Sequence, residues 1–168
     1  MINFKNIYFS IGGVPIFENA SGFVPTGHKV GIVGRNGVGK TTLFKLILNE
    51  IIPDSGVIEV PKSFKVGSVS QEAPSTDETL LDTVLSADIE RSKLLSESQV
   101  ERDPNKIAEI HTRLSDINAY SAEARASSIL NGLGFNKNDI LKPCSSFSGG
   151  WRMRVALASV LFSNPELL

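Results

Sequence analysis

The feature that most constrains the fold is the run GRNGVGKT at positions 34–41, which fits the pattern G-x-x-x-x-G-K-[ST]. The compact apolar segment KVGIV at 29–33 precedes it, and residues 41–50 carry an apolar pattern that favours a helix. A strand, a glycine-rich loop and a helix in this order form a phosphate-binding loop, because glycines let backbone N–H groups turn toward phosphate oxygens. We therefore predict an α/β fold in which this loop binds the phosphates of a nucleotide.

The residue types at the end of the loop suit two separate tasks. Lys40 is expected to reach the β- and γ-phosphates, and Thr41 to offer its hydroxyl to Mg²⁺. The following helix points its free N–H groups and partial positive charge at the same anion. The predicted nucleotide contacts are Gly34, Arg35, Asn36, Gly37, Val38, Gly39, Lys40, Thr41 and Thr42.

Apart from the glycine loop and its helix, the sequence of the first 70 residues is typical of strands. Short β-leaning runs punctuated by glycine and proline predict strands at 7–9, 22–24, 29–33, 57–60 and 66–69. The helix after the loop is expected to stop before Pro53. We assign residues 1–74 to a β core that carries the phosphate-binding loop.

The pattern becomes helical after Pro74. One helix is predicted over 79–100, Asp103-Pro104 is expected to cap and begin a second, and that second helix runs to about residue 133. Residues 75–142 thus form a helical subdomain, an antiparallel pair whose charges are expected to face solvent. Residues 143–168 return to the core through a Ser-Gly-Gly turn and a helix over 151–162, and 166–168 resemble the opening of a strand.

Composition excludes several classes of protein. With 17 Lys and Arg against 18 Asp and Glu, the formal net charge is −1, so bulk charge does not hold the chain to nucleic acid or membrane. Cys144 is the single cysteine and cannot form an intramolecular disulfide, and with two histidines it leaves too few ligands for a zinc cluster. No signal peptide is visible, and the longest apolar stretch, 155–162, is too short to span a membrane. We expect a soluble, cytoplasmic protein without membrane insertion.

A second glycine turn, near the end of the chain, indicates which family of P-loop proteins the sequence resembles. Residues 147–154, FSGGWRMR, place Ser148, Gly149 and Gly150 at a helix N-terminus and resemble the LSGGQ signature motif of ABC ATPases. Together with the phosphate-binding loop and the helical insertion, the whole chain resembles a P-loop NTPase of the ABC type, an incomplete nucleotide-binding domain with a helical arm. The variants GRNGVGKTT, SGGW and Asn164-Pro165-Glu166 resemble the ABC-F family, and more narrowly the N-terminal cassette of a Uup-like member.

The resemblance implies further roles. Gln71 matches the glutamine that meets Mg²⁺ or positions the attacking water, and Ile11 stands where the family often stacks an aromatic ring on adenine. The Ser148–Gly150 turn of one cassette would close on ATP held by a second cassette in the same polypeptide. ABC-F proteins bind ATP and Mg²⁺ and act at the ribosome in translation, so ribosomal RNA is an expected partner. On the signature helix, Arg152 and Arg154 are expected to face solvent, and contact with a phosphate or RNA is the alternative.

The resemblance also indicates what the 168 residues do not contain. An ABC cassette continues from the signature helix into an apolar strand that ends in the Walker B aspartate, followed by a catalytic glutamate and later a switch histidine. We expect the parent protein to be an ATPase truncated here just before Walker B, and this chain alone to be inactive in hydrolysis. Two alternatives stay open: a nucleotide-binding subunit of an ABC transporter, and a nucleotide-binding module without turnover.

Overall fold

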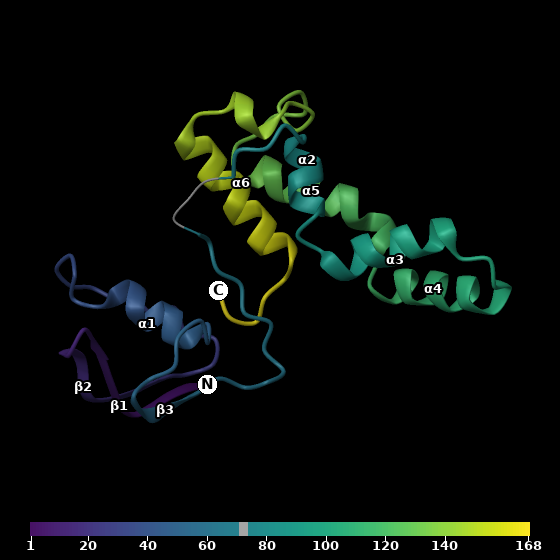
Figure 1. The fold of residues 1–168 in the computed structure, drawn as a ribbon. Coiled ribbons are helices and arrows are strands. Elements are labelled where there is room, and N and C mark those ends of the chain that lie inside the picture. Colours follow the sequence, from purple (N-terminus) through teal and green to yellow (C-terminus); the bar gives the residue numbers. More distant parts are fainter. Residues whose placement is uncertain (71–73) are drawn as a thin grey trace. The chain divides into compact units, whose positions relative to one another are not determined.

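The computed structural model describes residues 1–70 and 74–168 (Figure 1). The described chain divides into two compact units, Met1–Phe64 and Lys65–Leu168. The first unit carries the phosphate-binding loop and the second carries the Ser-Gly-Gly turn.

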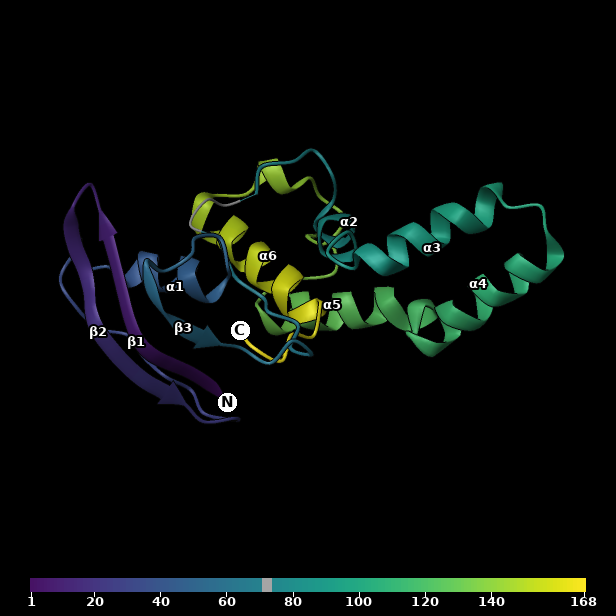
Figure 2. The same cartoon turned by 60° about the horizontal axis from the view of Figure 1, so that its bottom comes forward.

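The first unit is built on a three-stranded sheet with the order β2-β1-β3. Strands β1 (Ile2–Ile11) and β2 (Val14–Val24) form an antiparallel hairpin, and β3 (Ser55–Glu59) pairs antiparallel with the other edge of β1 (Figure 2). The hairpin turns at Gly12 and Gly13, whose φ angles of 59° and 81° are in the region that favours glycine. These strands confirm the predictions at 7–9 and 22–24, and β3 confirms the one at 57–60 to within two residues at its start.

Helix α1 (Lys40–Ile47) follows the glycine loop, as predicted. The side chain of Leu46 on this helix is buried. The helix ends earlier than Pro53, because the chain reverses at Asn49, whose φ is 60°. Asparagine tolerates this left-handed conformation better than most residues, and a helix cannot continue through it.

Two predicted strands are wrong. Residues 29–33 and 67–69 form no strand, and Val66 makes only one isolated parallel bridge, to Leu167. A strand exists only through hydrogen bonds to a neighbour, and none of the three described strands pairs with 29–33. Its apolar side chains are therefore exposed, with Val33 at 95% of its full accessible area.

The second unit has its core among three helices. Helices α2 (Leu80–Leu85), α5 (Ala122–Gly132) and α6 (Gly149–Phe162) pack against one another, and the short turns η1 (Ala119–Ser121) and η2 (Cys144–Ser146) flank them. No helix among residues 1–70 and 74–168 is long and apolar enough to span a membrane. The buried core cluster consists of Leu80, Val84, Leu85, Ala122, Ala126, Leu130, Phe135, Ile140, Cys144, Val155, Ala158 and Phe162.

An antiparallel pair, α3 (Ile89–Val100) and α4 (Pro104–Asp116), extends from this core as an arm (Figure 2). The pair confirms the predicted hairpin, but each of the two predicted helices is interrupted. Asp88 accepts a hydrogen bond from Arg91 N and begins a new helix inside 79–100. The second helix breaks at Asn118, whose φ is 54°. Asp103 caps α4 and Pro104 begins it, as expected.

Candidate functional site

The phosphate-binding loop requires glycine at two positions for steric reasons. A Cβ added at Gly34 would lie 2.8 Å from Val38 Cγ1, and one at Gly39 would lie 2.6 Å from Ile16 Cγ2 on β2. Gly37 and Gly39 also have φ angles of 83° and 103°. The loop therefore holds a tightly turned backbone that side chains at these positions would disrupt.

Lys40 folds back over the loop that precedes it. Its ammonium Nζ donates to the carbonyl oxygens of Gly34, at 2.9 Å, and Arg35, at 2.8 Å. The loop is further closed by Val38 N, which donates to Arg35 O at 3.3 Å. A phosphate in the loop would meet a positive charge already aimed at it, held only by neutral acceptors that the phosphate can replace.

The first turn of α1 suits an anion. The first helical hydrogen bond runs from Leu43 N to Gly39 O, so the N–H groups of residues 40–42 have no acceptor within the helix. No acidic residue lies in this turn to compete for the positive end of the helix dipole. Thr41 is exposed here, which leaves its hydroxyl accessible to a metal ion. These residues fit the phosphates of a nucleotide and one oxygen ligand of Mg²⁺.

The position expected to meet the base has no aromatic ring. Ile11 pairs with Val14 across the end of the β1–β2 hairpin, and 57% and 63% of these two side chains are exposed. The pair offers apolar contact to a base without π-stacking. Gln71, the other residue expected to contact nucleotide and metal, lies outside the described residues.

The Ser-Gly-Gly turn begins α6 in the second unit. Ser148 occupies the N-cap position with extended backbone, and its carbonyl accepts from Arg152 N at 2.9 Å, but its side chain makes no capping hydrogen bond. A Cβ added at Gly149 or Gly150 would meet nothing within 4 Å. Packing among residues 1–70 and 74–168 therefore does not demand these glycines. They leave exposed backbone that another molecule can approach closely.

Sequence reasoning missed a cluster of rings beside this turn. Phe135 packs edge-on against Phe147, with ring centroids 5.7 Å apart, and against Trp151, at 5.0 Å. The guanidinium of Arg154 lies 4.4 Å from the Trp151 ring centroid and donates to Leu133 O at 3.3 Å. Arg154 was expected to face solvent; it is exposed and also makes these two contacts. The available signal was the i, i+3 spacing of Trp151 and Arg154, which brings these two side chains to one face of α6.

Cys144 is a core residue. It is fully buried, and its Sγ lies 3.6 Å from Pro74 O. Burial raises the pKa of this thiol, because the apolar surroundings disfavour the thiolate. The side chain therefore contributes packing and not reactivity.

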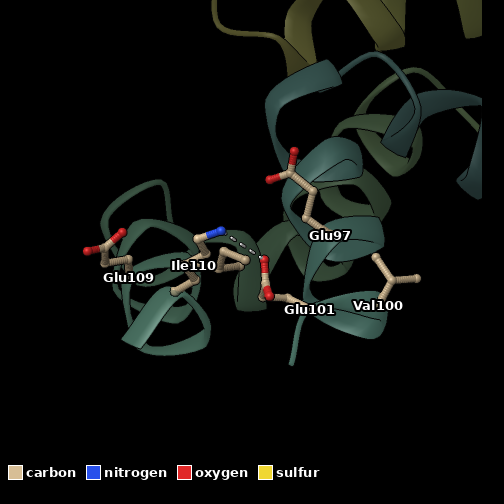
Figure 3. Close-up of a pocket in the computed structure, with 6 residues that line it drawn as sticks. Glu97, Val100, Glu101, Glu109 and Ile110 are labelled. Carbon is tan, nitrogen blue, oxygen red and sulfur yellow. Dashed lines mark ion pairs between the residues drawn. The ribbon is translucent and has the colours of Figure 1, made fainter. Parts of the chain in front are cut away.

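A groove of about 400 Å³ lies on the arm (Figure 3). Its polar lining is mainly acidic, from Glu97, Glu101 and Glu109, and Lys106 pairs with Glu101 at 3.8 Å. Val100 and Ile110 supply its apolar part. The groove holds none of the residues that the sequence assigned to nucleotide binding.

Comparison with known proteins places this geometry in context. A family model described as "ABC transporter" matches residues 17–168. The chain is similar to "Probable ATP-binding protein YheS" of Haemophilus influenzae, at 39% identity over 100% of this chain and 27% of that protein. "ABC transporter F family member 3" of Arabidopsis thaliana is 38% identical over 99% of this chain and 26% of that protein. "Protein GCN20" of Saccharomyces cerevisiae is 36% identical over 93% and 24%. The chain thus spans about a quarter of the length of these relatives.

Solved structures show the same fold. "Structure of ATP binding subunit of ABC transporter" matches with a TM-score of 0.69 and 16% identity, covering 98% of this chain and 63% of that one. "Dimeric Structure of MJ0796, a Bacterial ABC Transporter Cassette" matches with a TM-score of 0.66 and 20% identity, covering 98% and 71%. At these identities the likeness concerns the fold, and it confirms the predicted P-loop NTPase class.

Proposed function

This chain belongs to the ABC transporter family, with relatives among the ABC-F proteins, and from that premise we propose that it is the ATP-binding cassette of an ABC-F ATPase. The whole protein hydrolyses ATP and acts on the ribosome in translation, in the cytoplasm. Its position as the first of two cassettes, and the closer likeness to a Uup-like member, are parts of the same proposal.

The observation that carries the proposal is the closed phosphate-binding loop. Lys40 is already turned over the loop, Gly34 and Gly39 have no room for a side chain, and the first turn of α1 is free of acidic residues. Preorganised donors of this kind bind phosphate with little loss of side-chain freedom.

Each residue has a task in binding the nucleotide. Lys40 exchanges its two carbonyl acceptors for phosphate oxygens, and the backbone N–H groups of residues 40–42, which have no acceptor within the helix, donate to the same phosphates. Thr41 holds the metal through its hydroxyl, with Gln71 as a second ligand or as the group that positions water. Bound Mg²⁺ neutralises charge on the β- and γ-phosphates. Ile11 gives the base apolar contact.

A second cassette is the proposed partner of the signature turn. The open space above Gly149 and Gly150 and the free side chain of Ser148 support this proposal, because a phosphate from another cassette can approach the helix N-terminus there. Dimeric cassettes among the solved structures of this fold support it further. For the 168 residues on their own we propose binding without appreciable turnover, since the resemblance places the water-activating carboxylates outside them.

Titration of the chain with MgATP tests the binding role. Replacing Lys40 by alanine removes a charged hydrogen-bond donor and should weaken binding by about 1.5–3 kcal/mol, which is about 10–150-fold in Kd. Lys45, in the last turn of the same helix, provides the matched control: Lys45→Ala should change Kd less than twofold. An unchanged titration curve for Lys40→Ala would reject the proposed site.

Ribosome association needs its own assay. The whole protein should cosediment with ribosomes when ATP is present, and Lys40→Ala should reduce that association. Nucleotide binding without any cosedimentation would reject the ribosomal role and leave the cassette assignment intact.

A further inference from the structure

The signature turn is not fastened by its own residues. Ser148 makes no side-chain capping bond, and Gly149 and Gly150 have no side chains with which to pack. A pair of glycines at the start of a helix is conformationally permissive. Something outside the turn must therefore set its direction.

Both flanks of the turn contact one buried ring. Phe147 precedes the turn, Trp151 follows it, and each packs edge-on against Phe135, at interplanar angles of 80° and 62°. Phe135 is 2% exposed and belongs to the core cluster, so it provides a fixed support. The two contacts hold the ends of the turn at one point of the core.

Arg154 holds Trp151, the residue that follows the turn, in place. It stacks on Trp151 and donates to Leu133 O, at the C-terminal end of α5, so the indole lies among Phe135, Arg154 and the end of that helix. Gly134 has a φ of 98°, and a Cβ there would lie 3.4 Å from Arg154 Nη1 and 3.8 Å from the Trp151 ring. The backbone at the end of α5 thus lies within van der Waals reach of this pair. Helices α5 and α6 are in contact in the same unit (Figure 1).

We infer that Trp151 is a positioning residue, which together with Arg154 fastens the Ser148–Gly150 turn to the end of α5 and so sets the direction in which the turn meets nucleotide. The inference rests on the proposed function, because the direction of the turn matters only if the turn closes on a nucleotide. Trp151 acts here through the turn, with its ring engaged by Phe135 and Arg154. The turn and the end of α5 consequently move as one piece.

The kinetic test measures ATP hydrolysis by the whole protein. Trp151→Gln restores the residue of the LSGGQ pattern but removes the ring, while Trp151→Phe keeps a ring against Phe135. We expect Trp151→Gln to lower kcat for ATP at least tenfold with KM changed less than threefold, since KM depends on the phosphate-binding loop. Trp151→Phe should retain at least a third of the parental kcat. Tyr120→Gln, which removes an exposed ring elsewhere in the same unit, is the control and should stay within twofold.

A second measurement needs no turnover. Amide hydrogen exchange of the 168-residue chain should be at least fivefold faster at 147–153 in Trp151→Gln, with exchange in α2 unchanged. Equal acceleration in α2 would mean that Trp151 only stabilises the core, and the inference would be wrong. So would a Trp151→Gln kcat within twofold of the parent. If the parent bound no MgATP, the proposed function would fail instead, and the exchange result would still decide whether Trp151 holds the turn.

Discussion

Replacing Gly39 by alanine measures how closely the phosphate-binding loop is packed against the sheet. The φ of this residue is 103°, and the new Cβ would lie 2.6 Å from Ile16 Cγ2 and 3.2 Å from Phe17 Cζ. The left-handed conformation costs an L residue about 1–2 kcal/mol. Overpacking adds about 1–3 kcal/mol. The free energy of unfolding should therefore fall by about 2–5 kcal/mol in total.

Gly37→Ala separates these two costs. Gly37 has a φ of 83°, but a Cβ there meets nothing within 4 Å, so only the conformational cost of about 1–2 kcal/mol should apply. Urea unfolding followed by far-UV circular dichroism gives both free energies under the same conditions. Adding Ile16→Ala to the Gly39→Ala chain removes the clashing methyl group, and a double-mutant cycle should show favourable coupling between the two changes. If Gly39→Ala destabilised the chain no more than Gly37→Ala, the close approach to β2 would be refuted.

Two other predictions follow from local contacts. Burial raises the pKa of the Cys144 thiol in the folded chain, so the stabilisation that this thiol confers is present below its unfolded pKa, and the free energy of unfolding should fall as pH rises above about 8.5. Cys144→Ala should remove that part of the pH dependence, and identical pH profiles for the two chains would contradict the raised pKa. Asp103→Ala removes the acceptor for Asn105 N, 2.9 Å away, and should lower the stability of α4 by about 1 kcal/mol, read as faster amide exchange in that helix; the isosteric Asp103→Asn should retain the cap, and equal exchange in both variants would argue against capping.

Local chemistry made much of the fold predictable. The β1–β2 hairpin follows from two glycines between β-leaning runs, and the break at Asp103-Pro104 follows from capping and the fixed φ of proline. The glycine loop and the helix that follows it were predictable from the pattern at 34–41, because that pattern requires a particular backbone geometry. The contacts of its residues with a nucleotide stay a prediction.

The secondary-structure predictions failed where contacts with residues distant in the sequence, or a local cap, determine the structure. Residues 29–33 have the composition of a strand, but strand structure depends on a neighbour that a local pattern cannot supply. Inside 79–100, apolar spacing continued through a point where the Asp88 side chain begins a new helix. The Phe135 contacts of Trp151 join residues 16 positions apart, so the signature motif predicted the turn but not what holds it.

The arm contributes nothing to the buried cluster of its unit. Every member of that cluster comes from α2, α5, α6 and the segments between α5 and α6, and α3 has no buried residue. On α4, Leu114 is fully buried but lies outside that cluster. Substitutions at the exposed positions of α3 and α4 should therefore leave the packing of the cluster intact. The surface sequence of α3 and α4 can therefore change to suit new partners, while the sequences of the phosphate-binding loop and the signature turn stay the same.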